Sequence, residues 1–152
     1  MFLDEIGDMA AGLQTRLLRV LAEGEFFRVG GQRPIKVDTR VIAATNQDLA
    51  KNVSQGAFRE DLYHRLNVMR IEIPPLRERR EDIRTLLEHY LALVSGELEV
   101  PTKVLSPDVL DRLVAFDWPG NVRQLVNACR RLTVIAPGRD IRLEDLPEEL
   151  GG

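Results

Sequence analysis

The residue types that could act on a phosphate group begin near the N-terminus. Asp4 and Glu5 directly follow the apolar residues 1–3, which are typical of the end of a buried strand. Ligands gather where the strands of open α/β sheets end, and an adjacent carboxylate pair there can hold the water shell of Mg²⁺ and polarise an attacking water. Acidic residues are common at strand ends, so the pair by itself favours a solvated loop.

Asn46 follows a second apolar stretch, residues 39–45. Its side-chain amide could reach a phosphate or orient a water across a neighbouring strand. An Asn in this place is more often a turn former whose side chain bonds its own backbone. Asn46 alone therefore does not distinguish a phosphate-binding residue from a turn residue.

Three arginines are candidates for binding an anion. Arg59 and Arg65 lie six residues apart in FREDLYHRL, so on a helix they point in different directions. Arginine can stabilise charge on a transferring phosphoryl group, especially from a neighbouring subunit. The alternative is that Glu60 and Asp61 pair with them on a solvated surface. Arg123 follows DWPGN at the start of a helix, where backbone amides favour anions; the alternative is an exposed first-turn residue.

Other kinds of site have little support. Gly30 and Gly31 indicate a hairpin turn, because no Gly-rich loop leads into a helix with Lys and Ser or Thr after it. The single cysteine, Cys129, excludes an internal disulfide, and with two histidines it leaves too few ligands for a zinc cage. Any metal would be a hard ion held by carboxylates. No arrangement of Ser, His and Asp indicates nucleophilic catalysis.

The composition is that of a soluble globular protein. Of the 152 residues, 44% are apolar and 30% are charged, which excludes a disordered chain. No apolar run approaches the roughly 18 residues of a membrane span, and the first residues lack the basic segment followed by an apolar one that is typical of an export leader. We expect a cytoplasmic location without membrane contact. The net charge of -3 is too balanced for gripping nucleic acid electrostatically, so we expect no direct DNA contact.

The predicted secondary structure falls into two parts, divided at Pro74 and Pro75, which end regular structure. Residues 1–75 alternate strand and helix patterns, and residues 76–152 contain helical patterns only. The predicted elements of the first part are a helix over 8–24 with Asp8 as N-cap, a hairpin of strands 25–29 and 34–37, a strand over 39–45, helices near 47–53 and 59–66, and a strand over 68–73. Helices over 83–94, 106–114 with Ser106 as N-cap, and 122–132 form a small bundle in the second part.

Six motifs in this order resemble the AAA+ domain of NtrC-like, sigma-54-dependent transcription activators: FLDEIGDM, LLRVLAEGEFFRVGG, VDTRVIAATNQDL, FREDLYHRLNV, IPPLRERREDI and WPGNVRQL. The likeness spans nearly the entire chain, and six ordered motifs are far more specific than any one. The fold class it implies is α/β: a truncated parallel-sheet AAA+ ATPase core in residues 1–75, followed by a small helical lid subdomain in residues 76–152.

The resemblance also implies a role for each candidate residue. Asp4 and Glu5 correspond to the Walker B pair, with Asp4 on Mg²⁺ and Glu5 on the attacking water. The other correspondences are Asn46 with the first sensor, Arg59 and Arg65 with arginines offered to the nucleotide of the adjacent subunit, and Arg123 with the second sensor in the lid.

The complete domain would bind ATP and Mg²⁺, assemble into a ring and remodel sigma-54 RNA polymerase. The P-loop of the family lies before the position matching Met1, and its DNA-binding helix-turn-helix lies after the position matching Gly152. We therefore expect a fragment that exposes apolar residues on its first helix and on the strand over 40–45, and that alone hydrolyses little ATP. The alternative is a stand-alone protein-interaction module without ATPase activity, whose charged motifs are interface residues.

Overall fold

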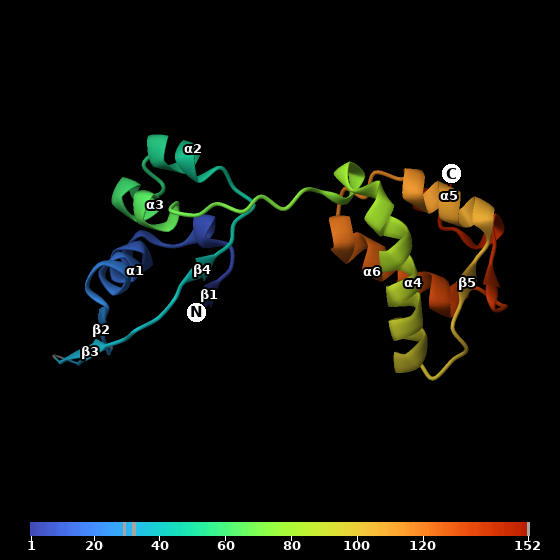
Figure 1. The fold of residues 1–152 in the computed structure, drawn as a ribbon, viewed down its shortest axis with the longest axis horizontal. Coiled ribbons are helices and arrows are strands. Elements are labelled where there is room, and N and C mark those ends of the chain that lie inside the picture. The colour runs from blue at the N-terminus through green and yellow to red at the C-terminus, as the bar shows by residue number, and fades with distance from the viewer. Residues whose placement is uncertain (29, 32, 152) are drawn as a thin grey trace. The chain divides into compact units, whose positions relative to one another are not determined.

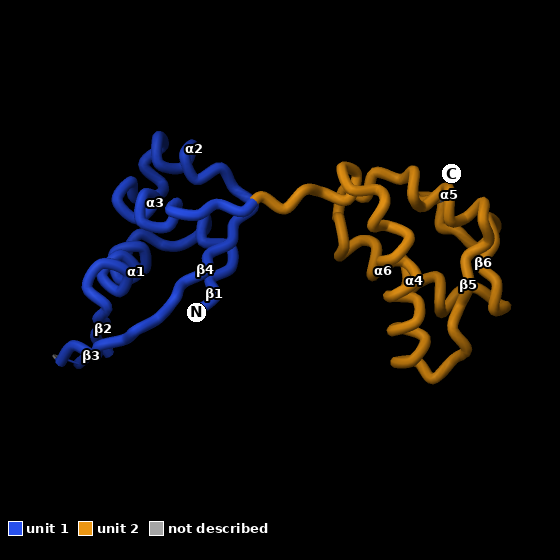
Figure 2. The backbone as a smooth tube through the Cα atoms, in the orientation of Figure 1, with its two compact units in different colours: residues 1–71 blue, residues 72–152 orange. Residues whose placement is uncertain are grey.

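The parallel sheet of the first unit is short. The structure, a computed structural model, describes residues 1–28, 30–31 and 33–151, and it divides into the units Met1–Ile71 and Glu72–Gly152 (Figure 2). In the first unit, β1 (Phe2–Leu3) pairs in parallel with β4 (Ile42–Ala43). The ladder continues past both strands, because the Ala44 amide donates to the Leu3 carbonyl at 2.8 Å and the Ile6 amide to the Ala44 carbonyl at 3.1 Å.

The connection between these two strands contains α1 (Ala11–Glu23). This helix begins later than predicted, and Asp8 is not its N-cap. Asp8 instead ends a 3-10 turn, η1 (Ile6–Asp8), and its carboxylate accepts a hydrogen bond from Gln47. The Asp8 side chain, which the sequence pattern predicted to cap the helix, is therefore bound instead to Gln47, a residue distant in the sequence. α1 ends at Gly24, whose φ of 65° is the left-handed conformation usual for a helix C-terminus.

The predicted hairpin follows α1. β2 (Glu25–Phe27) pairs antiparallel with β3 (Pro34–Lys36), with Phe26 opposite Ile35. Gly30 has a φ of 76°, as a tight turn requires. Residue 29, the predicted end of the first hairpin strand, lies outside the described residues, as does residue 152 at the end of the predicted lid.

Two short helices complete the first unit. α2 (Leu49–Ser54) is capped by Asp48, which accepts a hydrogen bond from the Lys51 amide, and α3 (Glu60–Leu66) follows. Apolar side chains of η1, α1 and α3, together with Phe58 from the loop before α3, form a small core. Its buried members are Ile6, Leu17, Phe58 and Leu62.

The prediction of a strand over residues 68–73 was wrong. Val68, Met69, Ile71 and Ile73 are 78–85% exposed and belong to no helix or strand. The apolar residues have strand-like composition, but a strand needs a neighbouring backbone for its hydrogen bonds. None of the sheets among the described residues includes this segment.

Three helices dominate the second unit, and α4 packs against both of the others (Figure 1). These are α4 (Arg80–Glu97), α5 (Pro107–Ala115) and α6 (Asn121–Ile135). The shorter elements are η2 (Leu76–Glu78), β5 (Val104–Leu105), β6 (Asp140–Ile141), η3 (Leu143–Asp145) and α7 (Glu148–Gly151). β5 and β6 pair in parallel, so the expectation of helices only was incomplete.

Trp118 is at the centre of this unit. It is fully buried, its ring meets that of Phe116 edge-on with centroids 5.2 Å apart, and its Nε1 donates to the Leu113 carbonyl at 2.8 Å. A buried indole costs free energy unless its N–H finds an acceptor. The DWPGN segment therefore serves the core of the second unit as well as the start of α6.

Candidate functional site

Asp4 and Glu5 leave β1 at its carboxyl end, and both are exposed. Glu5 has a φ of 51° in the left-handed region, which non-glycine residues rarely adopt. Its amide donates to Asp4 Oδ1 at 2.9 Å, and its carbonyl accepts from the Asp8 amide at 3.1 Å. The two carboxylates are thus held on a tight turn, and backbone strain of this kind concentrates at functional sites.

Asn46 follows β4 and lies at the same edge of the sheet. The register places Leu3 opposite Ala43, and the two strands run in the same direction, so their carboxyl ends are adjacent. Asn46 is exposed, and within the described part of the chain its side chain forms no hydrogen bond to its own backbone. The structure therefore brings Asp4, Glu5 and Asn46 to one edge, as their positions after two apolar stretches indicated.

A polar contact that the sequence analysis missed joins the turns beside these residues. Gln47 Nε2 donates to Asp8 Oδ1 at 2.6 Å, and Gln47 Oε1 accepts from Asn52 Nδ2 at 2.7 Å. The Gln47 amide donates to Thr45 Oγ1 at 3.0 Å. Glutamine in a polar loop usually indicates a solvated side chain, so only the structure reveals this bridge.

Arg59 is held within its own unit by a carboxylate. Its Nε and Nη2 donate to the two oxygens of Asp61 at 3.0 and 2.7 Å, and its Nη1 donates to Thr15 Oγ1 at 3.3 Å. The hydrogen bond from Arg59 lowers the pKa of Asp61, and the same bond raises the pKa of Arg59. The surface pairing considered as the alternative role is present for Arg59 and Asp61.

The backbone of Arg59 is fixed by a buried glutamine. Gln14 on α1 is only 1% exposed; its Nε2 donates to the carbonyls of Met9 at 2.8 Å and Ala57 at 3.1 Å. Its Oε1 accepts from the Arg59 amide at 2.9 Å. Because all three bonds run to backbone groups, Gln14 ties the start of α3 to α1. The only sequence signal for this role is the position of Gln14 on the apolar side of the helix.

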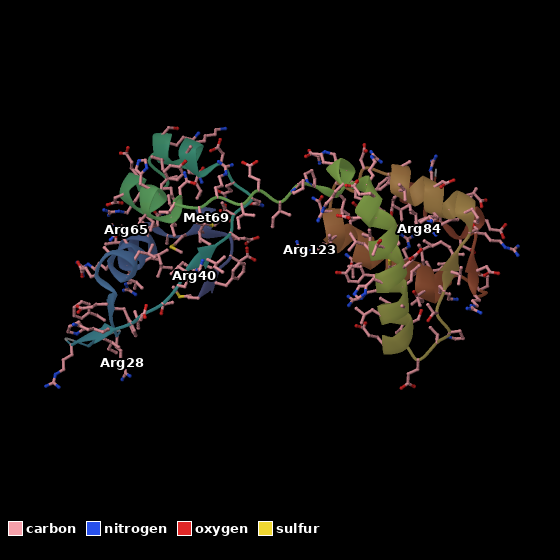
Figure 3. The ribbon with its side chains drawn as sticks, in the orientation of Figure 1. Arg28, Arg40, Arg65, Met69, Arg84 and Arg123 are labelled. Carbon is pink, nitrogen blue, oxygen red and sulfur yellow. The ribbon has the colours of Figure 1, made fainter. Side chains whose placement is uncertain are left out.

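Arg65 reaches α1 at a different point. Its Nε donates to the Leu21 carbonyl at 3.3 Å, and its side chain is exposed on α3 (Figure 3). Thr15, which Arg59 contacts, and Leu21 lie six residues apart on α1, about 9 Å along a helix axis. The two guanidinium groups therefore do not form one clamp, in agreement with their spacing.

Arg123 lies in the first turn of α6, in the second unit, and is exposed (Figure 3). The hydrogen bonds at the start of this helix are made by other residues. Asn121 has a φ of 50°, and its Oδ1 accepts a hydrogen bond from the Leu76 amide at 2.9 Å. Gln124 Oε1 accepts from the Gly120 amide at 2.9 Å. Within the described residues the guanidinium of Arg123 has no ion-pair partner, so it remains available to an anion.

The oxygen atoms at the sheet edge suit a hard cation such as Mg²⁺. No cluster of three His, Cys, Asp or Glu side chains occurs in the described residues. Mg²⁺ is usually held by one or two carboxylates, waters and substrate phosphates, and Asp4 and Glu5 offer such carboxylates.

Cys129 is no candidate nucleophile, because burial raises the pKa of its thiol to about 12.

A surface hollow elsewhere in the chain has no part in this chemistry. It measures about 390 Å³ and lies in the second unit, lined by Ser106, Asp108, Arg142, Leu143 and Glu144. The carboxylates of the first unit are instead exposed on an open edge.

Known protein families match both parts of the chain in order. A family model described as the sigma-54 interaction domain matches residues 1–72, and one described as the AAA+ ATPase lid domain matches residues 77–152. The fold and the two family matches together define the class of protein: the chain contains part of an AAA+ core followed by the AAA+ lid. The chain belongs to the AAA+ domain family of NtrC-like, sigma-54-dependent transcription activators.

Individual relatives agree with this assignment. The chain is similar to the DNA-binding transcriptional regulator NtrC of Salmonella typhimurium, with 59% identity over 150 residues, and to the regulatory protein AtoC of Escherichia coli, with 49% identity over 150 residues. Both alignments cover 99% of this chain and 32% of the relative, so the chain spans about a third of their length.

Two solved structures show the same architecture. NtrX from Brucella abortus superposes with a TM-score of 0.93 and 40% identity, covering 99% of this chain and 35% of that chain. NtrX in complex with ATP superposes with a TM-score of 0.91, 40% identity and the same two coverages. The fold class implied by the sequence motifs is thereby confirmed.

Proposed function

We propose that this chain is the section of a ring-forming ATPase that carries the Walker B pair, the first sensor, the arginine fingers and the lid. In the complete cytoplasmic protein, ATP hydrolysis would remodel the closed complex of sigma-54 RNA polymerase. The main support is the parallel register of β1 and β4, which puts Asp4, Glu5 and Asn46 at one sheet edge. A related NtrX structure in complex with ATP adds support from the family.

Each residue at the edge has a chemical task in this proposal. Asp4 would hold Mg²⁺ through its hydration shell, and the ion supplies positive charge to the β and γ phosphates when bound. Glu5 would orient the attacking water and accept its proton, for which a carboxylate in hydrogen-bond reach suffices. The Asn46 amide would orient the same water or a phosphate oxygen.

The arginines would act on charge that develops during phosphoryl transfer. Arg59 and Arg65 are proposed to approach the nucleotide of a neighbouring subunit, and Arg123 to contact nucleotide from the lid. Arg59 must first leave Asp61, whereas the one hydrogen bond that the structure gives Arg65 goes to a carbonyl. We therefore assign the larger catalytic effect to Arg65.

A chimera tests this function. The chain would replace the aligned 150-residue segment of NtrC, and phosphate release would be measured with and without Mg²⁺. We expect Mg²⁺-dependent turnover, and Glu5→Gln should lower kcat about 100-fold or more because it removes a general base. Glu23→Gln, at the exposed end of α1, is the matched control and should retain turnover. A chimera without ATPase activity, or one indifferent to Glu5→Gln, would contradict the proposal.

Subunit mixing tests whether the site is shared between neighbours. Chimeras carrying only Glu5→Gln and chimeras carrying only Arg65→Ala should each be nearly inactive. Mixed together, they form interfaces in which an intact Glu5 meets an intact Arg65, so part of the turnover should return. If activity does not recover, Arg65 acts within its own subunit or only through partner affinity, as in an interaction module.

The chain alone gives a further check. It has no Lys-bearing glycine loop to cradle the β and γ phosphates, so we expect far slower hydrolysis than from the chimera. Robust Mg²⁺-dependent phosphate release by the purified 152-residue chain would contradict this expectation.

A further inference from the structure

Gln47 connects the two turns that carry the candidate site. Its Nε2 donates to Asp8 Oδ1 at 2.6 Å across 39 residues of sequence. Asp8 is itself bound to the site, because its amide donates to the Glu5 carbonyl at 3.1 Å. The Gln47 side chain is therefore two contacts away from the strained turn that holds Glu5.

The same residue restrains the backbone on the other side. Gln47 directly follows Asn46, and its amide donates to the hydroxyl of Thr45, which directly precedes Asn46, at 3.0 Å. The outer end of the side chain is also held, since Oε1 accepts from Asn52 Nδ2 on α2 at 2.7 Å. Both amide atoms of Gln47 thus have partners, and the turn around Asn46 is fixed to its surroundings.

Gly7 shows how tightly this bridge is packed. A Cβ atom at Gly7 would lie 2.7 Å from Gln47 Oε1, closer than real contacts allow, and 3.0 Å from Thr45 Oγ1, which is a tight contact. Any larger residue there would displace the Gln47 amide. The Gln47 side chain therefore keeps this position only beside a residue without a Cβ atom.

We propose that Gln47 is a positioning residue that sets Glu5 and Asn46 in register for the reaction, acting through its side-chain hydrogen bonds to Asp8 and Asn52. The inference rests on the proposed ATPase function and adds to it a residue that touches no substrate. Since positioning affects the reacting geometry more than nucleotide affinity, loss of the bridge lowers kcat and leaves KM nearly unchanged.

A reversal of donor and acceptor tests this assignment in the NtrC chimera. Gln47→Glu places a carboxylate against Asp8 and removes the donor, so kcat should fall about 10- to 100-fold, with KM within about twofold. Asp8→Asn alone keeps an acceptor oxygen for Gln47, so its effect should be smaller. The double variant, Asp8→Asn with Gln47→Glu, restores one hydrogen bond in the opposite direction and should recover most of the lost kcat. Gln55→Glu, an exposed glutamine at the end of α2, is the matched control.

The outcomes separate this inference from the proposed function. If the unsubstituted chimera has no ATPase activity, the proposed function itself is contradicted. In an active chimera, an unchanged kcat with Gln47→Glu, or a loss that the double variant does not rescue, overturns the positioning role. If circular dichroism shows that the Gln47→Glu variant does not fold, the Gln47→Met variant is tested in its place. Methionine keeps the length of the side chain but forms neither hydrogen bond. A lowered kcat then supports the role, and an unchanged kcat overturns it.

Discussion

The two units of this chain differ in how they are held together. Among the described residues, the second unit has fourteen buried residues in one hydrophobic cluster, with Trp118 fully buried. The first unit, of similar length, has only four in its cluster. It also leaves Phe2 63% and Ile42 60% exposed on its short sheet. Packing therefore stabilises the lid far more than the part that carries Asp4 and Glu5.

Specific polar contacts have a larger share in the first unit. Gln14 joins α1 to the start of α3, and Gln47 joins the turns after β1 and β4. Elements with few buried apolar contacts open more readily, and functional segments are often drawn from them. Asp4, Glu5 and Asn46 therefore lie in the unit with the smaller buried core, where single polar side chains define the geometry.

The largest effect on stability is expected in the core of the second unit. Leu87 on α4 is fully buried, so Leu87→Ala should cost about 2–5 kcal/mol through the cavity it leaves. Trp118 is the only tryptophan, so its fluorescence during urea denaturation reports this unit alone. Leu93→Ala, on the same helix but 47% exposed, is the control. Equal shifts for both variants would contradict the packing difference described above.

A smaller loss is expected from the buried amide of the first unit. Gln14→Leu removes three hydrogen bonds, with the Met9 and Ala57 carbonyls and the Arg59 amide; each typically contributes about 0.5–1.5 kcal/mol to stability. Hydrogen exchange should speed up in α1 and α3, while the urea midpoint of Trp118 fluorescence stays the same. Gln55→Leu, at an exposed position, should change neither. A shifted Trp118 midpoint would show that the two units do not unfold separately.

The exposed apolar segment after α3 should affect dye binding more than stability. Ile71 is 80% exposed, so Ile71→Ser should change the free energy of unfolding by less than about 0.5 kcal/mol. Apolar surface of this kind binds hydrophobic dyes such as ANS, and the substitution should reduce their fluorescence. Leu143→Ser, at a residue 49% exposed in the second unit, should reduce it less. Equal reductions would mean that the segment is no special binding surface.

The smallest effect concerns the exposed ion pair of the first unit. Arg59 lowers the pKa of Asp61 through its hydrogen bond, so the pair favours the folded state above the ordinary Asp pKa of about 3.9. That contribution is lost as pH falls through the lowered pKa. Arg59→Ala should return the pKa of Asp61 to its ordinary range in an NMR titration. Arg84→Ala, which removes a comparable pair with Glu88 at 3.0 Å, should not move it.

Local sequence patterns predicted the helices and the hairpin well. Apolar spacing located α4 to α6, and a glycine pair located the turn between β2 and β3. Such patterns work because a helix or hairpin forms its hydrogen bonds between residues close in sequence. They did less well for β5 and β6, which are two residues each, and failed for residues 68–73, where composition indicated a strand without a partner.

The candidate site residues could be identified from the order of residues along the chain, because carboxylates that follow apolar strands and motifs in a fixed order are recognisable in a sequence. Which partners these residues contact depends on the fold. The Asp8–Gln47 and Gln14–Arg59 contacts join residues 39 and 45 positions apart, and amide side chains look alike in sequence whether buried or solvated. Register and burial depend on how distant segments pack, so a pattern read along the chain cannot specify them.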